Sequence, residues 1–264
     1  MTCTFARSEP MATMDVYWLE QTEADVPVVN RWLSAREMSL LHRMRFPKRR
    51  NDWRLGRWTA KRALAACLNL PNNLSALAGT EILAAPSGAP EVLLFSQRAP
   101  VTISLSHRAG RAICGVALSE DCIGCDLEIV EPRSDAFTVD YFTASEQTLV
   151  EQTPMEERPL LVTLLWSAKE SALKALHMGL RLDTTCLDVR FVEELPAAIE
   201  QYRHSLLISS SAPNPDEWHP LHVLVLGGQA FHGWWRHADH MVRTVVSALP
   251  LRSPIHSACF FQER

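Results

Sequence analysis

Two carboxylates stand two residues apart inside an apolar run, in the stretch CIGCDLEIVEP at residues 122–132. If this run forms a strand, Asp126 and Glu128 point to the same face. Two negative charges held that close repel each other, so they need either bulk water around them or a cation between them. The pair is therefore either the solvent-facing side of a strand or part of a divalent cation site, and its hard oxygens would suit Mg²⁺.

A third carboxylate lies in the apolar stretch LLWSAKESALKAL, at residues 164–176. In a helix, Trp166, Glu170 and Lys174 are spaced i, i+4 and i+8 and share one stripe. Glu170 and Lys174 could form an ordinary surface ion pair. Because the helix is apolar on most sides, we expect both groups to be partly enclosed, where a carboxylate and an ammonium suit a metal-bound phosphate.

A serine and a histidine follow an apolar strand in VTISLSHRAG, at residues 101–110. Ser106 and His107 can both donate hydrogen bonds to a phosphate, although Ser106 could also bond its own backbone in a turn. Adjacent residues of a strand point apart, and the chain has no G-x-S-x-G elbow. We therefore exclude a serine hydrolase.

Four motifs in order carry a resemblance to a known family: ISLSHRAGRAICGVAL, IGCDLEIVEPR, FTASEQ and WSAKESALKAL. They resemble the 4′-phosphopantetheinyl transferases of the single-chain, two-lobed type that activate nonribosomal peptide and polyketide synthetases. FPKRRNDWRLGRWTAKRAL resembles the basic N-terminal helix region of the same group. The resemblance implies an enzyme of the holo-[acyl-carrier-protein] synthase type. Such an enzyme transfers 4′-phosphopantetheine from coenzyme A to a serine of an acyl or peptidyl/aryl carrier protein and releases adenosine 3′,5′-bisphosphate.

The resemblance also implies roles for the acids and their neighbours. Asp126, Glu128 and Glu170 would be Mg²⁺ ligands, and Lys174 would bind the α-phosphate of coenzyme A. His107 would donate to the pyrophosphate or the 3′-phosphate, with Ser106 beside it. The general base stays open between Glu170, a metal-bound water and another acid. Glu146 occupies a capping-box position three residues after Thr143, which favours a structural role.

The 3′-phosphate should meet a cationic wall, and the basic stretch before residue 60 offers four candidates: Arg36, Arg49, Arg50 and Arg54. A solvated basic face, or docking of an acidic carrier, is the alternative for the same residues. The chain departs from the family at Ala89, which stands where a Gly-Lys-Pro lysine often contacts the nucleotide. Aromatic residues at 137, 141 and 142 either close the core or form a docking patch for a carrier helix within residues 131–150.

These side chains need two units to position them, and the order of elements predicts an α+β fold. We expect an N-terminal lobe over residues 14–119, a C-terminal lobe over 120–248, and tails at 1–13 and 249–264. The resemblance implies a pseudo-dimer of two similar lobes, each with a short, mainly antiparallel sheet and a long helix, and an active site in the cleft between them.

Capping-box and proline signals predict helices over about 34–46, 48–70, 143–152 and 156–178. Apolar runs predict strands at 15–19, 80–84, 91–95, 101–105, 186–192, 204–209, 221–227 and 240–248. The runs at 111–118 and 122–130 are predicted to pair as a hairpin, and the chain after residue 249 to be irregular.

Composition excludes several classes of function. The net charge of −4 argues against binding of nucleic acid through bulk charge, and no apolar run reaches the ~18 residues needed to span a membrane. Seven scattered cysteines and no secretion signal predict a cytoplasmic protein, with Cys122 and Cys125 as buried, inert thiols. We expect a monomer. The remaining rivals are a Mg²⁺-dependent nucleotide phosphodiesterase and a non-enzymatic module that binds partners through its basic helix.

Overall fold

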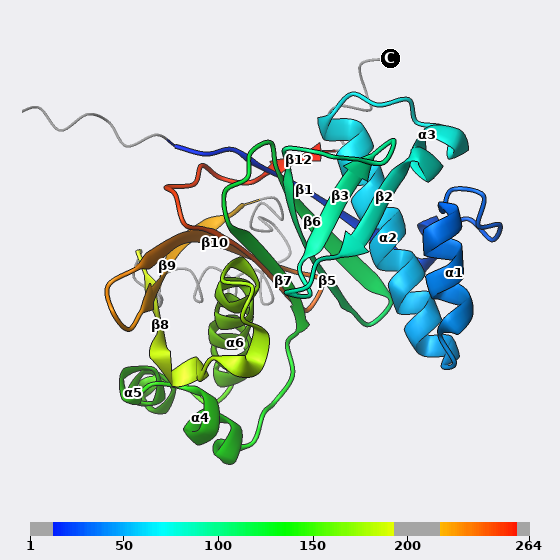
Figure 1. Cartoon of the computed structure of the whole chain (residues 1–264). Helices are drawn as coiled ribbons and strands as arrows, with labels where there is room; N and C mark the ends of the chain where they lie inside the picture. Colours follow the sequence, from blue (N-terminus) through cyan, green and yellow to red (C-terminus); the bar gives the residue numbers. More distant parts are fainter. Residues whose placement is uncertain (1–12, 193–216, 258–264) are drawn as a thin grey trace, which may run out of the picture.

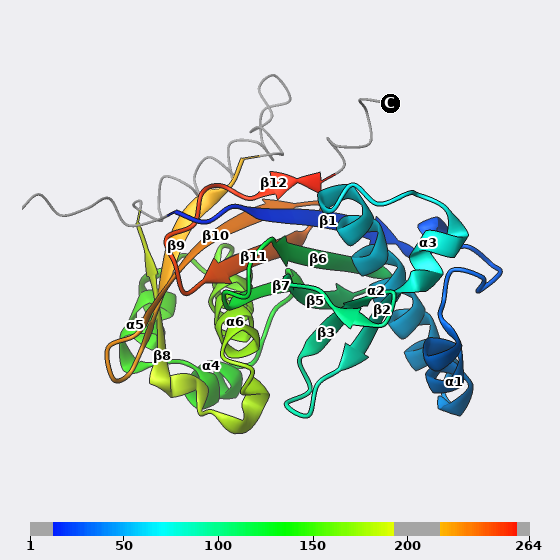
Figure 2. The same ribbon diagram turned by 45° about the horizontal axis from the view of Figure 1, so that its top comes forward.

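Three sheets organise the part of the chain that the computed structural model describes, residues 13–192 and 217–257. A four-stranded sheet has the order β12–β1–β6–β5, and a five-stranded sheet has the order β7–β11–β10–β9–β8. A small third sheet has the order β2–β3–β4. Figures 1 and 2 show the two larger sheets side by side, with α1, α2 and α3 on the side of the first and α4, α5 and α6 on the side of the second. The fold is α+β, as the sequence predicts.

The N-terminal half runs from β1 to β6. Its elements are β1 (Val16–Thr22), η1 (Glu23–Asp25), α1 (Ala35–Arg43), α2 (Pro47–Cys67), α3 (Leu74–Gly79), β2 (Thr80–Ala84), β3 (Pro90–Leu94), β4 (Gln97–Arg98), β5 (Thr102–Arg108) and β6 (Arg111–Ala117). The Ser34–Glu37 capping box starts α1, and Pro47 is the first residue of α2, as predicted. The long helix α2 packs against β1 and β6.

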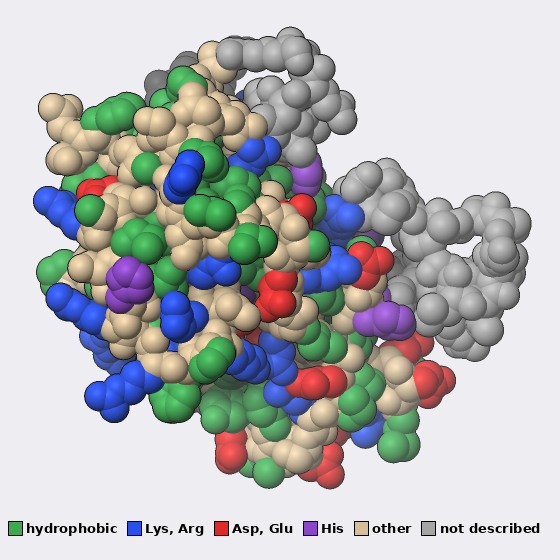
Figure 3. All heavy atoms as spheres, turned by 90° about the vertical axis from the view of Figure 1, so that its right-hand side faces the viewer, with side chains coloured by type: hydrophobic (Ala, Val, Ile, Leu, Met, Phe, Trp, Pro, Cys, Tyr) green, Lys and Arg blue, Asp and Glu red, His purple; other side chains and the backbone are tan. Residues whose placement is uncertain are grey.

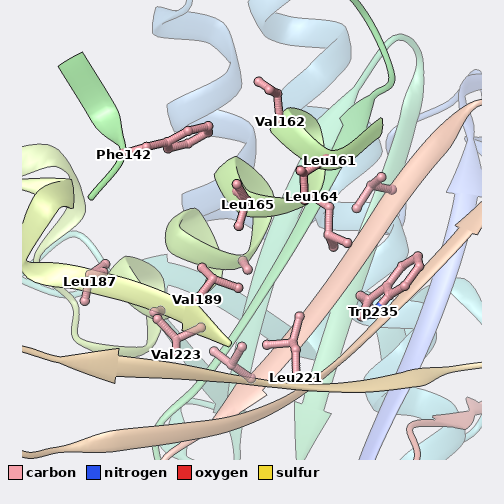
Figure 4. Packing of buried hydrophobic residues seen from close by; sticks show 14 of the residues in the cluster. Phe142, Leu161, Val162, Leu164, Leu165, Leu187, Val189, Leu221, Val223 and Trp235 are labelled. Atoms are coloured by element: carbon pink, nitrogen blue, oxygen red, sulfur yellow. The ribbon is translucent and has the colours of Figure 1, made fainter. Parts of the chain in front are cut away.

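The C-terminal half runs from β7 to β11. Its elements are β7 (Ile123–Ile129), α4 (Asp135–Tyr141), α5 (Ala144–Gln152), α6 (Arg158–Ala175), η2 (Gly179–Arg181), η3 (Thr184–Cys186), β8 (Leu187–Phe191), β9 (His219–Val225), β10 (Ala230–Ala238) and β11 (Met241–Ser247). Figure 4 shows side chains of α6 directed at Leu221 and Val223 of the sheet. The strand predicted at 204–209 lies outside the described residues.

The predicted hairpin between 111–118 and 122–130 is wrong. β6 is already paired on both edges, with β5 and with β1. Its hairpin partner is β5, because Ala109 and Gly110 with φ of 50° and 72° form a two-residue turn between them. β7 therefore joins the second sheet, where it pairs with β11. β7 still lies against β5, since the Ser104 hydroxyl accepts from the Cys125 N–H at 2.9 Å.

The segment after β11 is more regular than the sequence predicts. Met14 and Leu251 form a β-bridge, and β12 (Ile255–His256) pairs in parallel with β1. The chain thus returns from the second sheet to the first and ties the two halves together. None of the helices within residues 13–192 and 217–257 is long and apolar enough to cross a membrane.

Both halves contain the same buried cluster of charged groups. The capping-box carboxylates Glu37 and Glu146 accept from Lys61 at 2.5 Å and from Lys169 at 2.7 Å. Each glutamate also accepts a backbone N–H from a strand, Ile82 at 3.1 Å or Val189 at 2.9 Å. The two lysines sit in matching stretches, WTAK at 58–61 and WSAK at 166–169. The halves thus share a local design that the sequence prediction missed.

Candidate active site

Asp126 lies where β5, β7 and α6 meet. Its Oδ1 accepts from the Ser106 hydroxyl at 2.8 Å and from the Lys174 ammonium at 2.7 Å. Lys174 also donates to the Cys125 carbonyl at 3.0 Å. Burial alone would lower the pKa of Lys174, but the Asp126 carboxylate outweighs that effect and raises it. The ammonium therefore stays charged beside Asp126, and the ion pair that forms is not the Glu170–Lys174 pair considered from the sequence.

Glu128 faces the same helix as Asp126 and is surrounded by cations. Arg108 lies 3.5 Å and Arg133 3.7 Å from its Oε2, while both are closer to Glu131, at 2.9 and 3.1 Å. The Trp166 indole acts with these cations to lower the pKa of the Glu128 carboxyl. Burial, followed by repulsion from Asp126, nevertheless raises the pKa of Glu128.

Glu170 completes the group from the side of α6. Burial raises its pKa first, and the negative charge of Asp126 raises it further, more than Lys174 lowers it. The predicted stripe of Trp166, Glu170 and Lys174 therefore does face β7. The structure brings Asp126, Glu128, Glu170, Lys174 and Ser106 into one neighbourhood.

A hard cation would satisfy what this neighbourhood lacks. Asp126 Oδ2 and Glu128 Oε2 are buried and have no hydrogen-bond partner. Three carboxylates that repel one another offer the oxygen ligands that Mg²⁺ prefers. In the described part of the chain, no three His, Cys, Asp or Glu side chains are gathered tightly enough to form a finished metal site. The donor chemistry thus fits Mg²⁺, and convergence of the three acids on one ion belongs to the proposal below.

A cavity of about 640 Å³ opens beside Lys174. Its wall includes β5, the turn between β2 and β3 with Ala89, and the end of α6. Two arginines, Arg57 and Arg181, and the imidazole of His177 also line it. Arg57 Nε is buried without a hydrogen-bond partner, and burial lowers the pKa of this guanidinium. Sequence reasoning missed Arg57, although it stands in the basic helix on which Arg54 was considered.

His107 lies on the opposite side of β5 from Ser106, because neighbouring strand residues point apart. It lines a separate hollow of about 530 Å³ with Lys48, Arg49 and Trp53 of α2. Figure 3 views the molecule from the side of α1 and α2 and shows Lys and Arg side chains spread over that face. The structure therefore does not place His107 beside Ser106 on one surface.

The other three predicted arginines lie apart from the acids. Arg54 donates to Asn30 Oδ1 at 2.8 Å and to the Pro27 carbonyl at 2.6 Å, so it holds the loop before α1. Arg36 is mostly exposed and pairs with Glu81 at 3.4 Å. Arg50 is exposed on the first turns of α2. Their roles as phosphate contacts stay predictions.

Several neighbouring residues have structural partners. Glu146 is saturated by Lys169 and two backbone N–H groups, as its capping-box position predicts. Phe137 packs its ring against Tyr141 at 4.8 Å and Trp166 at 5.2 Å, so it covers the helix that carries Glu170. Cys125 is buried as predicted, but Cys122 is exposed because it precedes the first residue of β7.

Comparison with known proteins singles out the C-terminal half. A model of the 4′-phosphopantetheinyl transferase superfamily matches residues 122–220, less than half of the chain. The match spans all three acids and Lys174, and it leaves out Ser106 and His107. No curated protein matches the chain.

The solved structures that resemble part of the fold include the holo-[acyl-carrier-protein] synthase (AcpS) of Thermotoga maritima, with 21% identity and a TM-score of 0.33. The comparison covers 49% of this chain and 63% of that one, so this chain spans less than two thirds of the length of the synthase. A similarity of this size carries no argument about function.

Proposed function

We propose that this protein transfers 4′-phosphopantetheine from coenzyme A to a serine of a carrier protein, with Mg²⁺ held by Asp126, Glu128 and Glu170. The observation that carries the proposal is the group of three acids itself, in which Asp126 is buried and Glu128 and Glu170 are partly buried. Asp126, whose Oδ2 accepts no hydrogen bond, lies with Glu128 and Glu170, whose pKa values are raised. The three carboxylates lie beside the Lys174 ammonium and a cavity large enough for part of a nucleotide-like substrate. The superfamily match over residues 122–220 supports the same reaction class.

The repeated Lys–Glu clusters support a pseudo-dimer of two similar lobes, with the site in the cleft between them. The cavity is lined from both halves, by Arg57 and Ala89 on one side and Leu173 and His177 on the other. Because two lobes of one chain supply the whole site, we expect a monomer. Cytoplasmic location and an acyl, peptidyl or aryl carrier as partner belong to the same proposal.

Asp126, Glu128 and Glu170 would hold Mg²⁺, whose positive charge would offset the negative charge that develops on the pyrophosphate of coenzyme A. Lys174, held in place by Asp126, would contact the α-phosphate as adenosine 3′,5′-bisphosphate leaves. Arg57 and the other cations of the cavity take the place that the missing lysine at Ala89 would fill for the nucleotide phosphates. Lys48 and Arg49, with His107 beside them, offer a second basic surface across β5. Glu170, whose pKa is raised, would accept the proton of the carrier serine, and a metal-bound water or another acid is the alternative base.

Incubation with coenzyme A, Mg²⁺ and an apo carrier protein tests the proposal. The carrier should gain about 340 Da, the mass of the phosphopantetheine arm whose phosphoryl group is transferred. Asp126→Asn should abolish most transfer, because its oxygens hold both the cation and Lys174. Asp15→Asn, at a distant pair with Arg252, is the matched control and should transfer normally.

One outcome would contradict the transferase reaction, and another would contradict the role given to the acids. Breakdown of coenzyme A in the absence of a carrier would indicate the phosphodiesterase. Full transfer by Asp126→Asn at limiting Mg²⁺ would show that Asp126 is not a ligand of the metal ion.

A further inference from the structure

The two buried lysine–glutamate pairs occupy equivalent positions in the two halves. Lys61 Nζ donates to Trp32 O at 3.0 Å and Leu77 O at 2.8 Å, which are 29 and 16 residues away. Lys169 Nζ donates to Tyr141 O at 3.0 Å and Thr184 O at 2.9 Å, which are 28 and 15 residues away. The Lys61 ammonium thus joins α2 to the segments that precede α1 and β2. The Lys169 ammonium joins α6 to the segments that precede α5 and β8.

Aromatic contacts extend the match. Trp58 meets Trp32 at 5.2 Å between ring centroids and an interplanar angle of 68°. Trp166 meets Tyr141 at 5.1 Å and 70°. Two-residue turns with positive φ also end the matching hairpins, at Ala109–Gly110 and Asp239–His240. The lysine hydrogen bonds, the aromatic contacts and the hairpin turns therefore repeat at equivalent residues of the two halves.

The equivalence shows what differs between the halves. Strand register pairs Leu19 with Cys114 and Asp126 with Thr244, and these partners stand at the fourth position of their strands. Leu19 therefore matches Asp126, and by the same register Gln21 matches Glu128. Arg62 follows Lys61 where Glu170 follows Lys169. The acids belong to the C-terminal half alone.

Each pair nonetheless holds a helix that faces the proposed site. Arg57, one helical turn before Lys61, lines the cavity with an unpartnered buried Nε. Glu170 follows Lys169 directly, and Trp166, three residues before Lys169, lowers the pKa of Glu128. The side chains of Lys61 and Lys169 are fully buried, so neither lysine can touch a substrate.

Stability alone gives a weak reason for keeping these pairs. A buried ion pair must overcome the loss of hydration of both charges, and apolar residues of similar volume often serve as well. Burial does lower the pKa of both lysines, more than the neighbouring carboxylates raise it. What an apolar side chain cannot do is fix one helix against three other segments through directed hydrogen bonds.

We propose that the two pairs are positioning devices, one for each half of the site: Lys61–Glu37 sets Arg57 at the coenzyme cavity, and Lys169–Glu146 sets Glu170 and Trp166 against β7. The inference rests on the proposed function. A displacement of about 1 Å at a reacting centre can lower a rate about 100-fold. Disruption of the two pairs should therefore change different kinetic constants. If both pairs only stabilised the fold, disruption of either pair would have the same effect.

The test compares Lys61→Met with Lys169→Met, each the control for the other. Lys61→Met should weaken coenzyme A binding, measured by calorimetry, by about tenfold or more, and raise its KM while kcat at saturating coenzyme A changes less than about threefold. Lys169→Met should lower kcat by about 100-fold, with little change in KM for coenzyme A. It should also weaken binding of Mn²⁺, used as the probe of the proposed Mg²⁺ site, by about tenfold. Glu37→Gln and Glu146→Gln, which keep one side-chain oxygen, should repeat this division in milder form and decide the matter if the methionine variants do not fold.

Equal losses in the two halves, or loss of stability with unchanged binding and kinetics in the folded variants, would overturn the inference while leaving transfer by the unmodified chain intact. An unmodified chain that binds neither coenzyme A nor Mn²⁺ would overturn the proposed function as well.

Discussion

The buried carboxylates should lower the stability of the protein when no cation is bound. The pKa of Glu170 is raised above its unfolded value of about 4.5, so its ionised form opposes folding at neutral pH. The loss of stability that Glu170 causes is absent when the pH is below the pKa of Glu170 in the unfolded chain. It grows as the pH rises through the pKa of Glu170 in the folded protein. Glu170→Gln should therefore raise the melting temperature of the metal-free protein at pH 7, by about 2–4 °C for each kcal/mol of repulsion removed, while transfer is lost.

Calorimetric melting with and without Mg²⁺ checks this prediction. Mg²⁺ should stabilise the unmodified chain by binding its folded form and should leave Glu170→Gln unchanged. Glu156→Gln, at an exposed position, is the control and should melt like the unmodified protein. A metal-free Glu170→Gln that melts lower than the unmodified chain would show that the carboxylate is a stabilising partner instead.

Lys174→Ala should reduce both kcat and stability. The ammonium lies 2.7 Å from Asp126, whose side chain is only 5% exposed, so its removal leaves a buried carboxylate with one hydroxyl partner. Loss of one preorganised charge-stabilising group lowers kcat by about 10²-fold. Loss of the partner of a buried charge costs up to about 3–5 kcal/mol. Kinetics at saturating substrates and urea unfolding measure the two effects, and an unchanged kcat would reduce Lys174 to a structural cation.

Short-range spacing predicted these acids because strand and helix periodicity fix which neighbours share a face. Asp126 with Glu128 and Trp166 with Glu170 obey such rules. Arg108, Arg133 and Arg57, whose Nε is buried, were missed, since only folding brings their segments to the site. The same alternation of side chains along a strand explains the acids and the Ser-His pair. Asp126 and Glu128 are two positions apart and share a face, whereas Ser106 and His107 are adjacent and lie on opposite faces.

At the scale of elements, the approach of α6 to β7 depends on one missing side chain. A Cβ added to Gly124 would lie 1.8 Å from the Ser171 carbonyl oxygen, which is backbone and cannot move alone. Gly124→Ala should push α6 away from Asp126, cost about 1–3 kcal/mol or more, and reduce transfer. Gly56→Ala in α2 is the control, because nothing lies within 4 Å of its added Cβ.

Gly56→Ala should stabilise the protein by about 0.5–1 kcal/mol, since alanine loses less entropy in a helix. Urea unfolding of both variants measures the difference. A Gly124→Ala protein as stable and as active as the unmodified chain would mean that α6 is not held in contact with β7 in solution.

Capping boxes located α1 and α5 from sequence because their signals lie within four residues. The pairing of β6 and the return of residues 251–256 to β1 could not be predicted in that way. Both depend on which strand edges remain free after distant segments have paired, and that is a property of the whole sheet. The repeated Lys–Glu clusters could not be predicted from the sequence for a related reason. WTAK and WSAK are short stretches, and only the fold shows which distant carbonyl groups accept hydrogen bonds from each lysine.

At the scale of the molecule, Glu20 joins the two large sheets. Its carboxylate on β1 accepts from Arg243 of β11 at 2.5 and 2.8 Å and from Arg111 of β6 at 3.0 Å. Burial alone would raise the pKa of Glu20, but the hydrogen bonds and charges of both arginines outweigh it and lower the pKa below 4.5. The proposed site lies between the same two halves, so this cluster should help to set the width of the cleft.

Glu20→Gln should destabilise the protein by about 1–3 kcal/mol at pH 7, because Arg243 is buried and loses its charged partner. A lowered pKa contributes stability above the unfolded value of about 4.5 and loses it as the pH falls through the folded one. The difference between the variant and the unmodified chain should therefore shrink below pH 4.5, as thermal unfolding across this range can show. Asp15→Asn, at the exposed pair with Arg252, should cost less than about 1 kcal/mol at any pH. If Glu20→Gln were as mild as Asp15→Asn at pH 7, the Arg243 cluster would have no part in joining the two halves or in holding the cleft.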